Sequence, residues 1–255
     1  MRSPLTEDVS WHLLLDPEGH RGAENMAIDA ALLGEAHRSG RAFLRLYRWD
    51  PPCLSLGRNE PAARRYDRAA IERLGLDVVR RPTGGRAVWH EAEVTYAVAA
   101  PIAAFGSLRE GYRRIHEQLV GGLRALGVTA TLASDGPIGS DGPGACFARP
   151  AGGEIVVGGR KLVGSAQVRQ RTALLQHGSI LLEGSQEMVR VISREPSVAG
   201  GETTLSAVLG RPVGFDEVAD AVMQAWSDGI TVAACDRPLP PSPARFSDPA
   251  WTWRR

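Results

Sequence analysis

Lysine is almost absent from this sequence. The 255 residues include 30 basic side chains, of which Lys161 is the only lysine and all the others are arginine. A guanidinium group is planar and stays protonated, whereas the pKa of a lysine ammonium shifts readily when the side chain is buried. A lysine kept in a chain that otherwise uses arginine therefore indicates a task that a guanidinium group cannot perform. The alternative is a hairpin lysine that stands there by chance.

Cysteines, net charge and long hydrophobic runs are also scarce. The three cysteines are far apart and form no CxxC pair, which argues against a structural zinc site and favours a reducing compartment. The formal net charge of +1 gives no reason to expect nucleic acid or an anionic membrane as a partner. No apolar run approaches the ~20 residues that cross a bilayer, and the N-terminus lacks a secretory pattern. We therefore expect a cytoplasmic protein without a metal site that binds neither nucleic acid nor membrane.

The length and the composition are those of one globular unit. A chain of 255 residues with 43% hydrophobic residues can bury one sizeable core. We expect a catalytic domain over residues 1–237 and a proline-rich tail over residues 238–255, which is either extended or lies on the domain surface. The phosphate-binding pattern GxxxxGK(S/T) does not occur.

The surroundings of Lys161 predict a β-hairpin. Residues 154–157 and 162–163 are β-type runs, and the dipeptide Gly158-Gly159 between them suits a turn with two positive φ angles. Lys161 then stands near the start of the returning strand.

Small residues follow the lysine. The tripeptide at 164–166, Gly-Ser-Ala, leaves room for a ligand or another backbone to approach closely. Residues 172–182 then predict a further strand, which we expect to be broken at His177-Gly178.

A second glycine pair lies in the segment PTGG at residues 82–85, between two predicted strands. The N–H groups of such a turn can face a ligand oxygen, as in anion-binding nests, and a plain hairpin turn is the alternative. Arg80, Arg81 and Arg86 stand beside the turn. They favour the binding of an anion or a polarised carbonyl there.

A loop rich in Gly, Ser, Asp and Pro spans residues 134–145 and ends at Cys146. Loops on rigid scaffolds often carry reactive groups, whereas most free cysteines are buried as small hydrophobic side chains. Both interpretations of Cys146 remain open at this point.

Several of these segments together resemble the lipoate/octanoate protein ligase and acyltransferase family. The matches run in the family's order from Glu24 to Leu182, and the family's glycine motif is RR-x-(S/T)-GG-x-AV-x-H. The matching segments are ENMAID at 24–29, PCLSLGR at 52–58, RRPTGGRAVWH at 80–90, EVTY at 93–96, GRKLVGSAQ at 159–167 and LQHGSIL at 175–181. The resemblance implies an α/β (α+β) fold like that of biotin ligases and class II aminoacyl-tRNA synthetases, a mixed sheet flanked by helices.

Three chemistries occur in this family. Ligases activate lipoate with ATP as an acyl adenylate, and a second class uses a cysteine just ahead of the His-Gly element, where this chain has the apolar Leu174. A third class carries its cysteine in an Ala-Cys-Phe context upstream of the lysine. This chain has that context at Cys146, 15 positions before Lys161, so it resembles the third class most.

The resemblance implies that Cys146 takes an octanoyl group from acyl carrier protein and passes it to a lysine of a lipoyl carrier domain, such as a glycine-cleavage H protein. Lys161 would lower the thiol pKa and relay a proton, and no cofactor would be needed. The alternatives are an ATP- and Mg-dependent lipoate-protein ligase and a non-catalytic module that binds acyl groups or carriers.

The predicted catalytic residues are Cys146 and Lys161. Backbone amides over residues 85–88 would stabilise the oxyanion, and Val88, Trp89 and Leu162 would line a slot for the acyl tail. His90 and His177 could equally have structural roles beside the turns. The predicted substrate-binding residues are Arg81, Thr83, Gly84, Gly85, Arg86, Ala87, Val88, Trp89, His90, Gly164, Ser165, Ala166 and His177.

Overall fold

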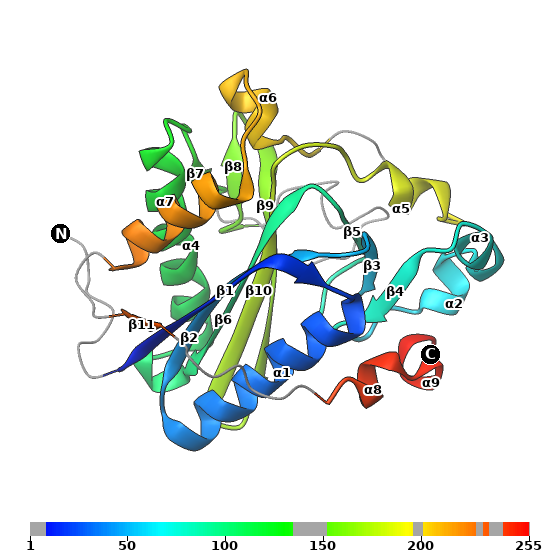
Figure 1. Cartoon of the computed structure of the whole chain (residues 1–255), viewed down its shortest axis with the longest axis horizontal. Coiled ribbons are helices and arrows are strands. Elements are labelled where there is room, and N and C mark those ends of the chain that lie inside the picture. The colour runs from blue at the N-terminus through cyan, green and yellow to red at the C-terminus, as the bar shows by residue number, and fades with distance from the viewer. Residues whose placement is uncertain (1–8, 135–151, 196–200, 228–231, 235–241, 255) are drawn as a thin grey trace.

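The computed structural model describes residues 9–134, 152–195, 201–227, 232–234 and 242–254. Its largest element is a mixed sheet with helices on both faces, and a smaller sheet stands beside one end of it (Figure 1). A mixed sheet flanked by helices is the predicted architecture. Cys146, the predicted nucleophile, lies outside the described residues.

The main sheet has eight strands in the order β11-β1-β2-β6-β10-β9-β8-β7. Strands β11, β1 and β2 run parallel to one another, and every later neighbour pairs antiparallel. The strands are β1 (Trp11–His20), β2 (Ala42–Trp49), β6 (Glu93–Pro101), β7 (Thr131–Leu132), β8 (Ile155–Val157), β9 (Arg160–Gln170), β10 (Ala173–Leu181) and β11 (Val232–Ala234).

The smaller sheet has three strands. Strand β3 (Cys53–Leu56) lies in the middle, parallel to β4 (Asp77–Arg80) and antiparallel to β5 (Val88–His90). The segment 82–85 connects β4 to β5, so the glycine turn lies at the edge of this sheet.

The two faces of the main sheet are covered by different helices, as Figure 1 shows for α4 and α7 on one side and α1 on the other. Because side chains alternate along a strand, Leu174 packs with Leu119 of α4 and the next residue, Leu175, packs with Met26 of α1. The helices are α1 (Gly22–Ser39), α2 (Ala62–Arg65), α3 (Arg68–Arg73), α4 (Leu108–Ala125), α5 (Glu187–Val191), α6 (Leu205–Leu209), α7 (Phe215–Ser227), α8 (Ala244–Ser247) and α9 (Pro249–Thr252).

The hairpin that carries Lys161 is confirmed. Gly158 and Gly159 adopt φ angles of +56° and +76°, which suit glycine, and they join β8 to β9. Lys161 is the second residue of β9, near the start of the returning strand.

The predicted break at His177-Gly178 is wrong. Strand β10 runs without interruption and pairs on both sides through this dipeptide. A Cβ atom on Gly178 would lie 2.3 Å from the carbonyl oxygen of Gly164 on β9. The glycine is therefore explained by the close approach of two paired strands.

The described part of the tail is helical and lies on the domain surface. Helices α8 and α9 pack against α1 and β4 (Figure 1). Phe246 is buried in the core on the α1 face, and Trp251 donates its indole N–H to the carbonyl oxygen of Arg80 at 2.8 Å.

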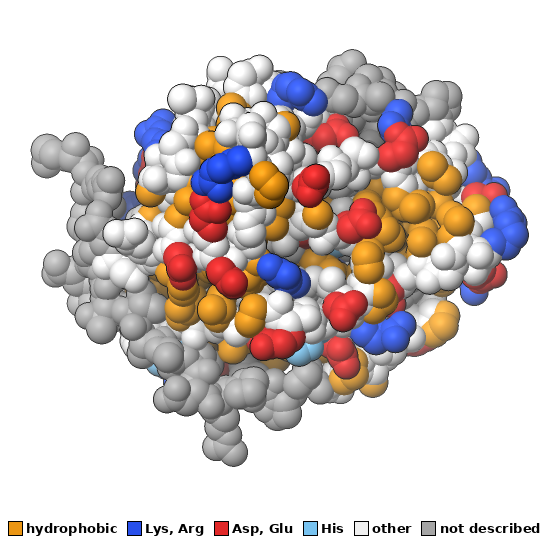
Figure 2. Space-filling model, turned by 45° about the horizontal axis from the view of Figure 1, so that its top comes forward, with side chains coloured by type: hydrophobic (Ala, Val, Ile, Leu, Met, Phe, Trp, Pro, Cys, Tyr) orange, Lys and Arg blue, Asp and Glu red, His pale blue; other side chains and the backbone are white. Residues whose placement is uncertain are grey.

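The charged side chains are mixed on the surface, as the small net charge predicts. Figure 2 shows acidic and basic groups side by side over one face, with hydrophobic side chains gathered between them. Among the described helices, none has both the length and the apolar character that crossing a bilayer requires.

Candidate active site

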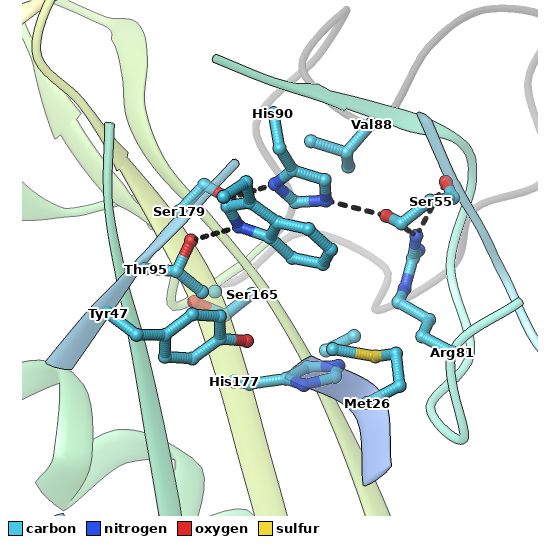
Figure 3. Close-up of a pocket in the computed structure, with 14 residues that line it drawn as sticks. Met26, Tyr47, Ser55, Arg81, Val88, His90, Thr95, Ser165, His177 and Ser179 are labelled. Atoms are coloured by element: carbon cyan, nitrogen blue, oxygen red, sulfur yellow. Dashed lines mark hydrogen bonds between the residues drawn. The ribbon is translucent and has the colours of Figure 1, made fainter. Parts of the chain in front are cut away.

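A pocket opens where the smaller sheet meets the main sheet (Figure 3). Its empty space is about 350 Å³, part of it open to solvent. The lining residues are Met26, Tyr47, Trp49, Ser55, Arg81, Val88, His90, Thr95, Gly164, Ser165, Ala166, His177, Gly178 and Ser179. They come from α1 and from six different strands, with Arg81 just beyond the end of β4.

Strand pleating explains part of this lining. Tyr47 and Trp49 on β2 are two residues apart, as are His177 and Ser179 on β10, so each pair points to one face. That face is the one that α1 covers.

His177 is held by partners on both ring nitrogens. Its Nδ1 lies 2.8 Å from Oδ2 of Asp29, and its Nε2 lies 2.6 Å from the hydroxyl of Thr83. Burial lowers the pKa of His177, although the hydrogen bond to Asp29 opposes this. The ring is therefore neutral, donates from Nδ1 and accepts the Thr83 hydroxyl at Nε2.

Asp29 is a fully buried carboxylate. It accepts hydrogen bonds from Nη1 of Arg45 at 2.9 Å and from the Tyr47 hydroxyl at 3.1 Å, besides the one from His177. Burial alone would raise its pKa, but the hydrogen bond from His177 and the charge of Arg45 outweigh this and lower the pKa. Thr83, predicted to bind substrate, thus belongs to a network that fixes the orientation of His177.

His90 repeats the same arrangement. Its Nδ1 lies 2.8 Å from Oε1 of Glu93, and its Nε2 lies 2.7 Å from the hydroxyl of Ser55. The Ser55 oxygen also accepts from Arg81 at 2.9 Å, so it links the guanidinium group to the imidazole (Figure 3). Trp49 stacks on the imidazole with 4.0 Å between the ring centres. Both pocket histidines therefore have a carboxylate at Nδ1 and a hydroxyl at Nε2.

The two arginines beside the glycine turn donate to backbone carbonyls. Arg81 donates to the carbonyl oxygens of Ser55, Gly84 and Arg86 at 2.6 to 3.2 Å. Arg80 is completely buried and donates to carbonyl oxygens of the 57–60 loop and of α9. Arg81 holds the glycine turn in shape and reaches the pocket wall. Arg80 instead ties the 57–60 loop to α9.

Lys161 does not line this pocket. Its side chain is 1% exposed, and its Nζ lies 2.6 Å from Oε1 of Glu154. It stands near His116 of α4, whose pKa burial lowers to about 4, with a smaller contribution from the charge of Lys161. The ammonium therefore belongs to a buried polar cluster on the α4 face of the sheet.

Ser165 connects that cluster to the pocket. It lines the pocket, and its hydroxyl lies 2.8 Å from Nε2 of His116 and 2.7 Å from the hydroxyl of Tyr96. Nδ1 of His116 lies 2.6 Å from the carbonyl oxygen of Gly153, so that nitrogen donates and Nε2 accepts the Ser165 proton. Sequence reasoning missed His116, although a histidine beside Ile115 in an apolar helix stripe was a signal for it.

The remaining predicted residues divide clearly. Of the predicted substrate-binding residues, seven line the pocket: Arg81, Val88, His90, Gly164, Ser165, Ala166 and His177. Ala87 and Trp89 pack instead in the core of the smaller sheet, and Leu162 packs on the α4 face, so neither Trp89 nor Leu162 lines the slot. The glycine turn, which stands behind the pocket wall, is formed by Thr83, Gly84, Gly85 and Arg86. The lining residues that sequence reasoning missed are Met26, Tyr47, Trp49, Ser55, Thr95, Gly178 and Ser179.

The part of the chain that the structure describes holds no group of three or more His, Cys, Asp or Glu side chains placed to bind a metal ion.

Neutral His116 should make the free energy of unfolding depend on pH. Its pKa is about 4 in the folded protein and ~6.5 when unfolded, so protonation favours the unfolded state. The stabilisation is complete above pH ~6.5, is lost as the pH falls towards ~4, and amounts to about 3 kcal/mol. The free energy of unfolding is measured with urea at pH ~7 and ~4.5. On acidification it should fall by about 2 kcal/mol less in His116→Gln than in the wild type. An identical loss in both proteins would contradict this account.

Known proteins are similar to this chain over most of its length. The sequence profile described as the lipoyl protein ligase A/B catalytic domain matches residues 21–227. The chain belongs to this family. Octanoyltransferase LipM of Carboxydothermus hydrogenoformans is 47% identical over 237 residues, covering 88% of this chain and 87% of the relative. Octanoyltransferase LipM of Kyrpidia tusciae is 40% identical over 241 residues, covering 87% of each chain.

Solved structures of the lipoyl protein ligase A/B family share the fold. A lipoate-protein ligase A bound with ATP superposes with a TM-score of 0.77 at 21% identity, covering 96% of this chain and 98% of the other. A putative lipoate protein ligase from T. acidophilum with bound lipoic acid gives a TM-score of 0.75 at 21% identity, covering 96% and 99%. At this identity the likeness shows the fold alone, and it confirms the predicted fold class.

Proposed function

We propose that this protein is an octanoyltransferase that moves an octanoyl group from acyl carrier protein to a lysine of a lipoyl carrier domain, such as a glycine-cleavage H protein. Family membership and the two octanoyltransferase relatives support acyl transfer in protein lipoylation. The observation that carries the proposal is the pocket between the two sheets, where the side chains of Met26, Trp49 and Val88 offer an apolar surface to an acyl chain.

The proposed nucleophile is the thiolate of Cys146. It attacks the thioester carbonyl of the octanoyl donor, a new C–S bond forms, and the carrier leaves as its thiol after taking up a proton. The ε-amine of the acceptor lysine then attacks the acyl-enzyme, an amide forms, and Cys146 is released. Thioester exchange is close to energetic balance and amide formation is downhill, so no nucleotide is required.

Lys161 is the proposed electrostatic partner of this thiolate. Cys146 precedes Glu154, which contacts Lys161, by eight residues, and eight extended residues span up to ~29 Å. The length of chain between them permits the sulfur to approach the ammonium, and a nearby ammonium lowers a thiol pKa. Lys161 is also able to pass a proton to the leaving thiol, since an ammonium gives up its proton far more readily than a guanidinium.

The pocket histidines have a positioning role in this proposal. His90 and His177 each have a partner on both ring nitrogens. They give the pocket fixed polar groups beside the apolar side chains of Met26 and Val88 (Figure 3). Such groups orient an acyl chain without taking part in bond formation.

The decisive test is transfer without nucleotide. The purified protein is mixed with octanoyl-acyl carrier protein and H protein in the absence of ATP and Mg, and the mass of the H protein is followed. We expect a mass increase of one octanoyl group, which is absent when the acceptor lysine of the H protein is replaced by alanine. Transfer that occurs only with free lipoate and ATP would establish a ligase instead, and acyl binding without either reaction would indicate a non-catalytic module.

A further inference from the structure

Three arginine side chains gather around the C-terminal helix α9. The guanidinium carbons of Arg245 and Arg254 each lie 3.7 Å from the ring centre of Trp251. Nη2 of Arg254 donates to the carbonyl oxygen of Arg58 at 2.7 Å. Arg58 and Arg245 are exposed, and Arg254 is half-buried. These three side chains are called the arginine cluster below.

The positive charges of Arg58, Arg245 and Arg254 act on one another. Burial lowers the pKa of Arg245, and the positive charge of Arg58 lowers it further. The pKa of Arg254 is lowered in the same way, by burial and by the charges of Arg58 and Arg245. Within the described ranges no carboxylate raises either pKa. The cluster therefore presents concentrated positive charge to a partner.

Elsewhere on the surface, several exposed arginines have carboxylate partners. Examples are Arg38 with Glu35, Arg113 with Glu110 and Arg211 with Glu217. The formal net charge of the whole chain is only +1. The arginine cluster is thus a local feature and does not follow from a generally basic protein.

The arginine cluster is held rigidly by the fold. Trp251, on which two of the guanidinium groups stack, donates its N–H to the carbonyl oxygen of Arg80. The fully buried Arg80 side chain in turn donates to the carbonyl oxygens of Thr252 and Arg254 at 2.9 and 3.1 Å. Guanidinium groups stacked on a fixed indole lose less side-chain entropy on binding an anion than freely moving ones.

The arginine cluster lies next to the glycine turn behind the pocket. The backbone N–H of Arg58 donates to the carbonyl oxygen of Thr83 at 2.8 Å. The hydroxyl of Thr83 holds His177 of the pocket wall, as described above. A protein bound at the cluster is therefore placed beside the turn that shapes the acyl pocket.

We propose that the arginine cluster docks a carboxylate-rich surface of the carrier protein that delivers the acyl thioester. This inference rests on the proposed function, because it assumes a donor on a protein carrier. A thioester at the end of a flexible prosthetic arm lets its carrier dock at a distance from the reacting atoms. The acceptor lysine, by contrast, belongs to its own protein surface and has to reach the acyl-enzyme directly. A docking site beside the pocket therefore suits the donor carrier, whose flexible arm brings the thioester into the pocket.

The test compares two donors. Steady-state transfer to H protein is measured with octanoyl-acyl carrier protein and with the small, uncharged octanoyl N-acetylcysteamine thioester. In the double variant Arg58→Gln/Arg245→Gln, the KM for the carrier donor should rise about fivefold with kcat nearly unchanged. Transfer from the small thioester should not change. Added NaCl should raise the KM of the wild type more than that of the variant.

Arg124→Gln is the matched control. Arg124 is an exposed arginine of α4, on the other side of the molecule from α9 in Figure 1. The Arg124→Gln variant should keep the wild-type KM and kcat for both donors. The docking proposal is overturned if the double variant keeps the wild-type KM for the carrier donor. It is also overturned if the KM values for both donors rise equally, or if only the KM for H protein rises. Competition by free inorganic phosphate as strong as that by the carrier would also overturn it, since the cluster would then recognise the phosphate of the prosthetic arm.

A failure of the proposed function remains distinguishable from a failure of docking. If the wild type transfers from neither donor, the proposed function is wrong. Docking is then judged from direct binding of octanoyl-acyl carrier protein to the wild type and to the double variant by biolayer interferometry. Equal affinity for the two overturns the docking site, and a weaker affinity for the variant supports it.

Discussion

Replacement of Cys146 should reduce octanoyl transfer by about 10³-fold or more, because the acyl-enzyme cannot form without its nucleophile. Mass spectrometry of the wild type after mixing with octanoyl-acyl carrier protein should show one octanoyl adduct on Cys146. The adduct should be absent in Cys146→Ala, and in Cys146→Ser any ester should turn over far more slowly. The time course of adduct formation should precede the appearance of octanoylated H protein.

The matched control for this experiment is Cys53→Ala. Cys53 is completely buried in β3, and burial, together with the negative charge of Asp77, raises the pKa of its thiol. A thiol of that kind is inert, so Cys53→Ala should keep both the adduct and most of the transfer activity. A protein that transfers at the full rate with an unmodified Cys146 would end the covalent mechanism.

Lys161→Arg should lower transfer by about 100-fold or more, although the substitution preserves the positive charge. The ammonium is 1% exposed and lies 2.6 Å from the Glu154 carboxylate, so the larger guanidinium group has to displace its neighbours. Its proton is also far less available for the leaving thiol. Single-turnover measurements should show that both adduct formation and adduct discharge are slow.

Arg160→Lys is the control for that substitution. Arg160 precedes Lys161 on β9 and is exposed, so exchanging its guanidinium for an ammonium should leave transfer within about twofold of the wild type. Thermal unfolding of Lys161→Arg establishes whether the variant is folded. Near-normal turnover of a folded Lys161→Arg would mean that the lysine supplies only a positive charge.

Local sequence signals predicted the elements that depend on neighbours in the chain. The two positive-φ glycines before Lys161 specify their hairpin turn because few other residues adopt that backbone. In α4 the buried apolar residues, including Ile115 and Leu119, recur at helical spacing, so this element also follows from local sequence. The prediction of a break in β10 at Gly178 was wrong. This glycine is required by the close approach of β9, which a local pattern does not reveal.

The candidate site was only partly predictable, because its walls come from distant segments. Motif resemblance located seven lining residues, yet it missed Tyr47 and Trp49, which reach the pocket only because β2 pairs with β6. It also did not show on which face of the sheet Lys161 lies. The pleat of β9 directs the ammonium into the cluster around Glu154 and His116, with Ser165 as the connection to the pocket.

By itself, the sequence determined the family, the hairpin that carries the solitary lysine and the order of the motifs along the chain. These follow from residue types at short spacing. The tertiary structure alone decided which face each strand residue points to, how the two pocket histidines receive their carboxylate partners, and where the tail gathers its arginines. Those features depend on strand pairing and helix packing between residues far apart in sequence, which no local pattern encodes.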